Sequence, residues 1–429
     1  MPHDEKKRIV ITLDGVGDGI SGSINVFDGV LMQRKQSFKQ SQSLGFLYGS
    51  IVDLLGMKRL EHEFKIMGLA PYAKKISGEK AYEEMRKIFW FDANSMKIHT
   101  AFDMSWATSN LLSRDLTVRY RFDSIAYGIQ KLTEEIIKDI VRASIKKYNI
   151  PNIVVGGGVF MNVKANQQVS DLPEVSSMVI TPSCGDESLA IGAAIYGYLK
   201  KCGGLDDLAK LENLYLGSEY SDEEIKMAID SYLGSSKWKI THYGPSTSIK
   251  VEDIVAKLLA SDAIVGRFKG RAEWGARALG NRSILANPSS RDNVKVINDI
   301  IKGRDFWMPF AVSLIYERQK KYLKNNRNLY APYMTITFNT TTQAHKEIIA
   351  GLHQYDLTSR PQMVKRDVNP DYYDLISSFE KLTGISGVLN TSFNLHGEPN
   401  VETHYDALRT FDLSGLKYLA IGNYLCSKN

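Results

Sequence analysis

The chain has 429 residues, 43% of them hydrophobic, which is enough for two packed cores because single cores stop growing at about 250–300 residues. Its apolar runs are far shorter than the roughly 20 residues of a membrane-spanning helix, and Asp14 interrupts the apolar start, so neither a membrane span nor a signal-peptide core is predicted. The net charge of +6, from 54 basic and 48 acidic residues, forms no basic stripe, so no nucleic-acid partner is expected.

The cysteines indicate the compartment. Cys184, Cys202 and Cys426 are odd in number and widely spaced, which is typical of a reducing environment rather than of a disulfide framework. A cytoplasmic protein is therefore expected.

The first strands of the chain are predicted from β-branched residues around aspartate-glycine turns. Residues 8–13 read as a strand that ends in a loop at residues 14–19. Residues 22–27 read as a second strand, antiparallel to the first, with a turn at residues 28–29.

A strand, glycine loop and helix order follows. Apolar residues at helical spacing predict a helix over residues 125–145. A short buried strand at residues 153–155 then enters three consecutive glycines, and a further helix is expected at residues 187–199.

The polar, glycine-containing stretch at residues 201–220 indicates a domain boundary, which we place between residues 215 and 216. The second half begins with a helical pattern around Ile254 and Leu258, and a strand is expected at residues 263–268. A window rich in arginine and lysine follows. A strand at residues 387–389 and a helix at residues 405–411 complete the prediction.

Three loops of the first half hold candidate binding residues. The first contains Asp14, Gly15 and Gly17, because glycine lets a backbone approach a phosphate and aspartate can hold a cation; an ordinary hairpin turn is the more common alternative. The second loop leaves a buried strand and enters a helix, an arrangement that can meet a nucleotide or another anion. Its alternative is a tight strand-to-helix connection. Its candidate residues are Gly156, Gly157, Gly158 and Asn162.

The third loop ends in Asp186 at a helix start, where an aspartate can either cap the helix or bind a metal. Two glycine loops followed by helices, with a strand-turn-strand opening, indicate the actin-like ATPase architecture. The strand pair and phosphate loop that open this architecture would precede the Asp14 loop, whereas only 13 residues do. An incomplete actin-like half-domain is therefore expected.

Motifs along nearly the whole chain resemble the NodU/CmcH family of carbamoyltransferases, whose members carbamoylate hydroxyl groups on sugars and antibiotics. The motifs are TLDGVGD at residues 12–18, EFKIMGLAPY at 63–72, GGGVFMN at 156–162, GRAEWGARALGNRSIL at 270–285, SRPQ at 359–362, and LNTSFN at 389–394 followed by GEP.

The resemblance implies an α/β protein with two domains. Residues 1–215 would be an actin-like (ASKHA) domain, similar to the tRNA threonylcarbamoyl-transferring proteins, and residues 216–429 a twisted-sheet domain similar to the YrdC-type carbamoyl-adenylate synthases. It also implies two reactions: carbamoyl phosphate and ATP, with Mg²⁺, would form carbamoyl adenylate on the second domain. The hydroxyl of a sugar or antibiotic acceptor would then attack its carbonyl on the first.

The basic window suits this chemistry, because planar guanidinium groups grip phosphate oxygens in pairs and stabilise charge during transfer. The candidate catalytic residues are Arg277, Arg282, Lys302, Arg304 and Arg360. Asn390, Ser392 and Asn394 are candidates to bind the carbamoyl amide or a phosphate, and Asn281 is a further candidate for cofactor binding. Each also has a purely structural alternative, such as shaping a turn or forming a surface ion pair.

Lys65 precedes the MGLAPY segment, which lines the family's transfer site, so it is a further catalytic candidate; the alternative is an ion pair with Glu61 at helical spacing. The family's metal site, for iron or a similar ion, uses two histidines four apart upstream of the Asp14 loop and an aspartate matching Asp186. The eight histidines here include no such pair, and only His3 precedes Asp14, so the metal site is expected to be incomplete.

Three explanations follow for the missing part: a separate N-terminal partner chain, a shortened reading frame, or a lost transfer step. A partner-dependent or non-catalytic subunit is therefore the alternative to a complete O-carbamoyltransferase, and a homodimer is left open. A sugar-kinase-like ATPase would fit the glycine loops but would leave the arginine-rich window unexplained.

Overall fold

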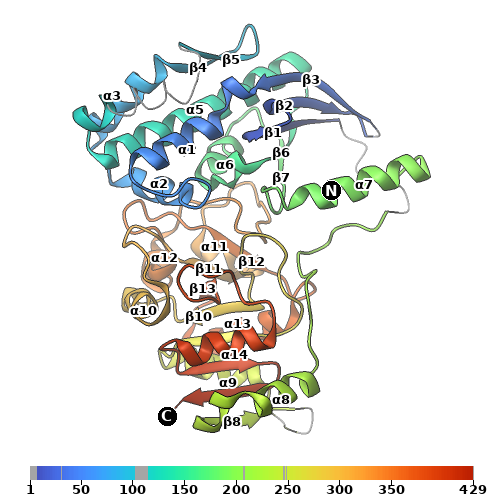
Figure 1. Cartoon of the computed structure of the whole chain (residues 1–429), viewed down its shortest axis with the longest axis vertical. Coiled ribbons are helices and arrows are strands. Elements are labelled where there is room, and N and C mark those ends of the chain that lie inside the picture. Colours follow the sequence, from blue (N-terminus) through green and yellow to red (C-terminus); the bar gives the residue numbers. More distant parts are fainter. Residues whose placement is uncertain are drawn as a thin grey trace. The chain divides into compact units, whose positions relative to one another are not determined.

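The structure is a computed structural model that describes residues 7–29, 31–101, 115–205, 208–244, 247 and 249–428. The chain forms two compact units, Met1–Lys210 and Leu211–Asn429, so the units meet at residue 210 where the sequence placed a boundary at residue 215. Both units combine sheets with helices (Figure 1), which confirms the predicted α/β class.

A five-stranded sheet forms the centre of the first unit, with strand order β3-β2-β1-β6-β7. Its strands are β1 (Arg8–Gly17), β2 (Ile20–Phe27), β3 (Met32–Lys39), β6 (Asn152–Gly156) and β7 (Ser177–Ile180). β3, β2 and β1 are antiparallel, and β6 and β7 continue parallel to β1. Ile9, Ile11 and Leu13 alternate along β1 and are buried on one face, as the period of two in a strand requires.

The helices of this unit are α1 (Leu44–Leu54), α2 (Glu63–Leu69), α3 (Lys75–Arg86), α5 (Phe122–Tyr148), α6 (Val163–Ser170) and α7 (Ser188–Cys202), and a hairpin of β4 (Phe89–Asp92) and β5 (Lys97–Thr100) accompanies them. The long helix α5 confirms the predicted helix at residues 125–145, because Ile125, Ile129, Leu132 and Ile136 form its buried stripe. It ends at Asn149, whose φ of 53° is the left-handed conformation that stops helices.

Helix α7 differs from the other helices of the first unit. It contains no buried residue, although its sequence is rich in apolar side chains, and Leu189 and Tyr196 are 69% and 61% exposed. Figure 1 shows it extending away from the remaining helices of the unit. None of the helices in the described ranges is both long and apolar enough to span a membrane.

An eight-stranded mixed sheet organises the second unit, with strand order β12-β11-β13-β10-β9-β14-β15-β8. Its strands are β8 (Trp238–His242), β9 (Val265–Phe268), β10 (Arg282–Ala286), β11 (Ala311–Ile315), β12 (Pro361–Val364), β13 (Gly387–Ser392), β14 (Tyr418–Ile421) and β15 (Tyr424–Lys428). Its helices are α8 (Asp222–Ser231), α9 (Val251–Ala260), α10 (Arg291–Ile297), α11 (Gln319–Tyr322), α12 (Thr342–Glu347), α13 (Pro370–Thr383) and α14 (His404–Leu413).

The end of the first strand was predicted wrongly. β1 continues to Gly17, which pairs with Ile20 across a two-residue turn, whereas a loop was expected over residues 14–19. Asp18 and Gly19 have φ angles of 51° and 78°, as tight hairpin turns with positive φ require. The register shifts between Leu13 and Gly17, so this segment is a bulged hairpin, the more common of the two alternatives.

Candidate anion-binding site

One edge of the eight-stranded sheet collects the basic residues of the second unit. β10 begins where β13 ends, because Ser283 pairs with Ser392 in antiparallel register. β11 is antiparallel to β13 and parallel to β12, so these two strands also begin at that edge. Arg282 opens β10 and Arg360 directly precedes β12. Strand pairing thus places residues that are far apart in sequence at one edge of the sheet.

Lys302 lies at this edge as the last residue of a π-helical turn, Asn298–Lys302, a rare conformation that recurs at functional sites. Its side chain is 2% exposed, and Nζ donates hydrogen bonds to Asn394 Oδ1 at 2.6 Å, Asn394 O at 3.1 Å and Ser392 Oγ at 3.2 Å. Burial, followed by the charge of Arg304, lowers the pKa of Lys302 to about 6. A bound anion would favour the charged amine.

Arg277, Arg304 and Arg360 act on one another electrostatically. Burial lowers the pKa of Arg304 to about 10, and the charge of Arg277 adds to this effect. Burial also holds the pKa of Arg360 well below its usual range, with further contributions from Arg277 and Arg304. The Arg304 guanidinium stacks over the Phe310 ring at 5.0 Å, and neither Arg304 nor Arg360 forms an ion pair with a carboxylate within the described ranges. The positive charges of Arg304 and Arg360 are therefore not balanced by a carboxylate of the described residues.

Arg282 has a different environment from the one predicted. Its guanidinium lies 3.6 Å from the centre of the Phe268 ring, and it donates to backbone carbonyls. The accepting oxygens belong to Ser218, Lys269, Gly270, Asn281 and Glu402. Burial lowers its pKa to about 10. These bonds support the structural alternative for Arg282, and a role in gripping phosphate stays a prediction.

The four predicted amide and hydroxyl residues divide into two pairs. Asn281 Nδ2 donates to the carbonyl of Arg271 at 2.8 Å, and Asn390 Nδ2 donates to the carbonyl of Ala278 at 3.1 Å, so both hold backbone. Ser392 and Asn394 instead contact Lys302, and Ser392 Oγ donates to Asn394 Oδ1 at 2.6 Å. Only the second pair reaches a side chain of the cationic cluster.

In the first unit, the two glycine loops pack directly against each other. Gly157 has a φ of 93°, and a Cβ there would lie 2.3 Å from the Leu13 carbonyl oxygen. A Cβ at Gly158 would lie 2.8 Å from Asp14 Oδ1, and the same oxygen accepts the Gly15 N–H at 2.7 Å. A Cβ at Gly156 would meet Thr181, whereas one at Gly17 would meet nothing. The absence of a side chain at 156, 157 and 158 is explained by packing.

Asn162 caps helix α6. Its Oδ1 accepts the Ala165 N–H at 3.0 Å, and its Nδ2 donates to Gln130 Oε1 at 2.9 Å. Gln130 in turn donates to Glu134 Oε1 at 2.7 Å, and burial raises the pKa of Glu134. Sequence reasoning missed Glu134, although its spacing from Gln130 places both on one face of α5.

Lys65 and Asp186 complete the predicted residues of the first unit. Lys65 is partly buried on α2, and Glu61, its proposed ion-pair partner, forms an ion pair with Lys58. Asp186 is exposed just before α7. The described residues contain no group of three or more histidine, cysteine, aspartate or glutamate side chains able to hold a metal, and His3 lies outside them. The donors present do not fit the family's metal centre, so no step is assigned to it.

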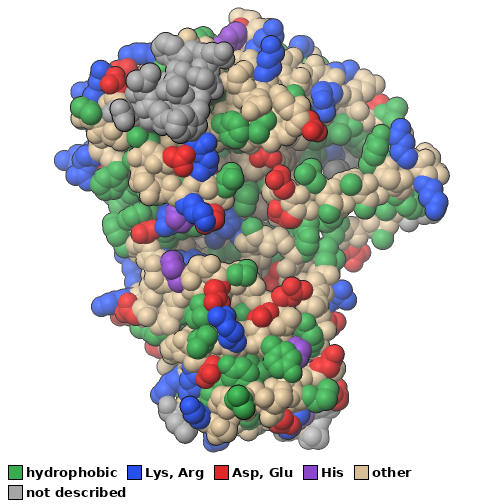
Figure 2. Space-filling view, viewed as in Figure 1, with side chains coloured by type: hydrophobic (Ala, Val, Ile, Leu, Met, Phe, Trp, Pro, Cys, Tyr) green, Lys and Arg blue, Asp and Glu red, His purple; other side chains and the backbone are tan. Residues whose placement is uncertain are grey.

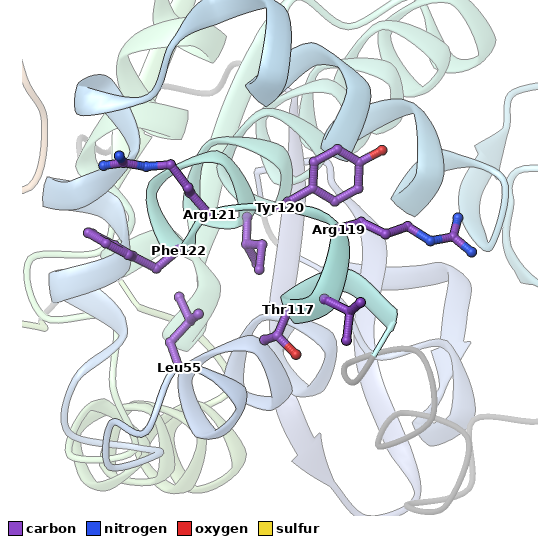
Figure 3. A pocket seen from close by; sticks show the side chains of 8 residues that line it. Leu55, Thr117, Arg119, Tyr120, Arg121 and Phe122 are labelled. Carbon is purple, nitrogen blue, oxygen red and sulfur yellow. The ribbon is translucent and has the colours of Figure 1, made fainter.

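A surface hollow of about 490 Å³ also lies in the first unit, lined by Leu55, Ile125 and residues 117–122. Figure 3 shows Arg119 and Arg121 extending in opposite directions, so the hollow does not gather their charges. None of its lining residues was predicted as a site residue. Basic and acidic side chains are interspersed over the face of the molecule that Figure 2 shows.

Comparison with known proteins shows the family of the chain. Residues 1–195 match the model of the carbamoyltransferase N-terminus, and residues 256–428 match that of the carbamoyltransferase C-terminus. Protein MJ1051 of Methanocaldococcus jannaschii is 32% identical over 99% of this chain and 80% of its own length. The chain therefore belongs to the carbamoyltransferase family, as the resemblance predicted.

Two nodulation proteins are among the relatives. NolO of Bradyrhizobium diazoefficiens is 28% identical over 99% of this chain and 76% of its own length, and NolNO of Sinorhizobium fredii is 29% identical over 99% and 61%. A solved structure of full-length HypF, bound to phosphate and nucleotide, matches with a TM-score of 0.28 at 18% identity, covering 41% of this chain and 21% of that one. A likeness at that score carries no argument about fold or function.

Proposed function

We propose that this carbamoyltransferase activates carbamoyl phosphate with ATP and transfers the carbamoyl group to a hydroxyl of a sugar-containing acceptor. The observation that carries the proposal is the cluster of Arg277, Lys302, Arg304 and Arg360 at one sheet edge, where Arg304 and Arg360 have no carboxylate partner among the described residues. Lys302 is buried and Arg304 and Arg360 are partly buried, and a cation withdrawn from water without a counterion is costly, so such a cluster is suited to an anionic ligand.

The proposed activation has two steps, and the atoms balance in each. Water converts carbamoyl phosphate to carbamate and inorganic phosphate. A carbamate oxygen then attacks the α-phosphorus of ATP, a new P–O bond forms, and pyrophosphate leaves, which gives carbamoyl adenylate. ATP would bring Mg²⁺ with it as part of the substrate. The guanidinium groups would hold the phosphate oxygens and stabilise the charge that develops on them.

Transfer would complete the reaction. The acceptor hydroxyl attacks the carbamoyl carbon, AMP leaves, and the hydroxyl proton is lost. The first unit is proposed to hold the acceptor during this step, with Lys65 and the Asp14 segment as candidate contacts. The acceptor class, the cofactor ATP and a supporting N-terminal partner chain are carried by the family resemblance rather than by the geometry of the described residues.

The test is a pyrophosphate-release assay with purified protein, ATP and Mg²⁺. We expect release that depends on carbamoyl phosphate, and at least a tenfold lower rate in Arg277→Ala, because a charge-assisted phosphate contact is worth about 1.5–3 kcal/mol. Protein that is folded but releases no pyrophosphate, and binds neither ATP nor carbamoyl phosphate in calorimetry, would refute the proposal.

A further inference from the structure

The segment that carries Arg277 is held by side chains rather than by secondary structure. Residues 274–281 form no helix or strand, and Gly275 and Gly280 have φ angles of 103° and 112°. Backbone of this kind keeps one conformation only if its polar groups find other partners. The position of the Arg277 side chain therefore depends on how firmly the backbone of this segment is held.

Glu273 supplies the acceptor for the backbone N–H groups of the segment. A single oxygen, Glu273 Oε1, accepts from Leu279 N at 2.7 Å, Asn281 N at 2.7 Å and Arg282 N at 3.1 Å. Hydrogen bonds to an ionised acceptor are roughly twice as strong as neutral ones. The other oxygen, Oε2, is buried without a hydrogen-bond partner among the described residues. The carboxylate is thus committed to the segment.

The carbonyl groups of the same segment accept hydrogen bonds from side chains of the sheet. Ala278 O accepts from Asn390 Nδ2 at 3.1 Å, Leu279 O from Gln362 Nε2 at 2.7 Å, and Gly280 O from Arg267 Nη1 at 2.7 Å. These donors lie on strands β13, β12 and β9 of the sheet. The segment is therefore held on the sheet edge by hydrogen bonds to its carbonyl groups from the sheet and to its N–H groups from Glu273.

We infer that Glu273 is a positioning residue that fixes Arg277 for anion binding through three backbone hydrogen bonds. The expected change in KM for carbamoyl phosphate rests on the proposed function, whereas the fixed position of Arg277 does not. Arg277 is four residues from Glu273, so loss of the shared acceptor frees the segment between them. The expected result is weaker binding of carbamoyl phosphate at a largely preserved fold.

The experiment compares Glu273→Gln, Glu273→Ala and a control, Glu347→Gln. Glu347 is also a partly buried carboxylate of the second unit, but it accepts from Tyr322 on α11, outside the cationic cluster. We expect Glu273→Ala to raise the KM for carbamoyl phosphate at least tenfold, because misplacing a binding group by about 1 Å can cost up to a hundredfold. Glu273→Gln keeps an acceptor oxygen and should raise the KM only about threefold. Glu347→Gln should leave KM within twofold of wild type while lowering thermal stability.

A second readout needs no turnover. Phenylglyoxal modifies accessible arginines, and mass spectrometry gives the rate at Arg277. We expect Arg277 to react several-fold faster in Glu273→Ala than in wild type and Glu347→Gln, and to react at an intermediate rate in Glu273→Gln. Equal Arg277 labelling in wild type and both Glu273 variants would overturn the inference, even where the proposed reaction is observed. If labelling changes as expected but wild type releases no pyrophosphate, the positioning role stands and the proposed function fails.

Discussion

The glycine loops of the first unit and the arginine-lined edge of the second were both predicted as binding sites, but their polar groups are used differently. In the first unit, Asp14 accepts from Gly15, and Asn162 caps α6 and binds Gln130. In the second unit, Arg304 and Arg360 both feel the positive charge of Arg277, and neither has a carboxylate partner among the described residues. Satisfied groups stabilise a fold, whereas partly buried like charges without counterions favour the binding of an anion.

Residues with satisfied and with unsatisfied polar groups also occur together in the second unit. Arg282 and Arg360 lie at the same sheet edge, but Arg282 donates to backbone carbonyls whereas Arg360 makes no such contact within the described ranges. Guanidinium groups are therefore assigned by their partners and not by their position. Variants that remove one group at a time test whether the comparison holds.

The largest effect is expected from Arg360→Ala. Removing a cation that is proposed to hold phosphate oxygens should lower carbamoyl-phosphate-dependent pyrophosphate release by about 10²–10³-fold, the usual loss for a group that stabilises developing charge. The measurement is the steady-state rate with both substrates saturating. The matched control is Arg366→Ala, six residues further along, where the arginine is 62% exposed and pairs with Asp374 at 2.6 Å. An equal loss in both variants would contradict a specific role for Arg360.

The next effect concerns proton uptake by Lys302. Its pKa is lowered to about 6, so most of the free protein holds a neutral amine at pH 8. A bound phosphate group favours the charged amine and raises this pKa, so binding should take up nearly one proton. Calorimetry of carbamoyl phosphate binding in two buffers of different ionisation enthalpy measures that uptake. Lys302→Met should abolish it, and uptake that persists unchanged in the variant would contradict the assignment.

Lys302 also predicts how stability depends on pH. The unfolded chain keeps the lysine proton up to about pH 10.4, whereas the folded protein releases it above about pH 6, so the unfolded state binds more protons between these values. Stability contributed by this residue therefore rises with pH across that window. Thermal unfolding from pH 6 to 9 should show a steeper rise in wild type than in Lys302→Met, while the exposed Lys257→Met should match wild type.

Periodicity was sufficient to predict much of the fold. The buried stripe of α5, the helical spacing at Ile254 and Leu258 in α9, and the strand that became β13 were all located from the sequence. The first strand was predicted to end at residue 13 rather than at Gly17, because the glycines and aspartates of residues 14–19 are common both in phosphate loops and in turns. Local composition gives no information on whether such residues are paired across a sheet.

The site was predictable only as a window of basic residues. The partners of Arg282 are carbonyls that include Ser218 and Glu402, and backbone acceptors at such separations leave no trace in a sequence. Glu273 was visible in the GRAEWGARALGNRSIL motif, but its three hydrogen bonds depend on the path of the backbone after it. Residue types in the sequence therefore indicated the chemistry, whereas the hydrogen-bond partners in the structure indicate the role of each residue.

The smallest effect is expected from Asn162→Ala in the first unit. Asn162→Ala removes a helix cap and a partner of Gln130, so it should lower stability by about 1 kcal/mol and the melting temperature by about 2–4 °C. Pyrophosphate release should remain within twofold of wild type, because the proposed activation uses the second unit. Ser221→Ala, which removes the cap of α8 in the second unit, is the matched control. If Asn162→Ala alone reduced pyrophosphate release tenfold at equal stability loss, Asn162 would contact a substrate, and the contrast between satisfied and unpaired groups would not separate structure from function.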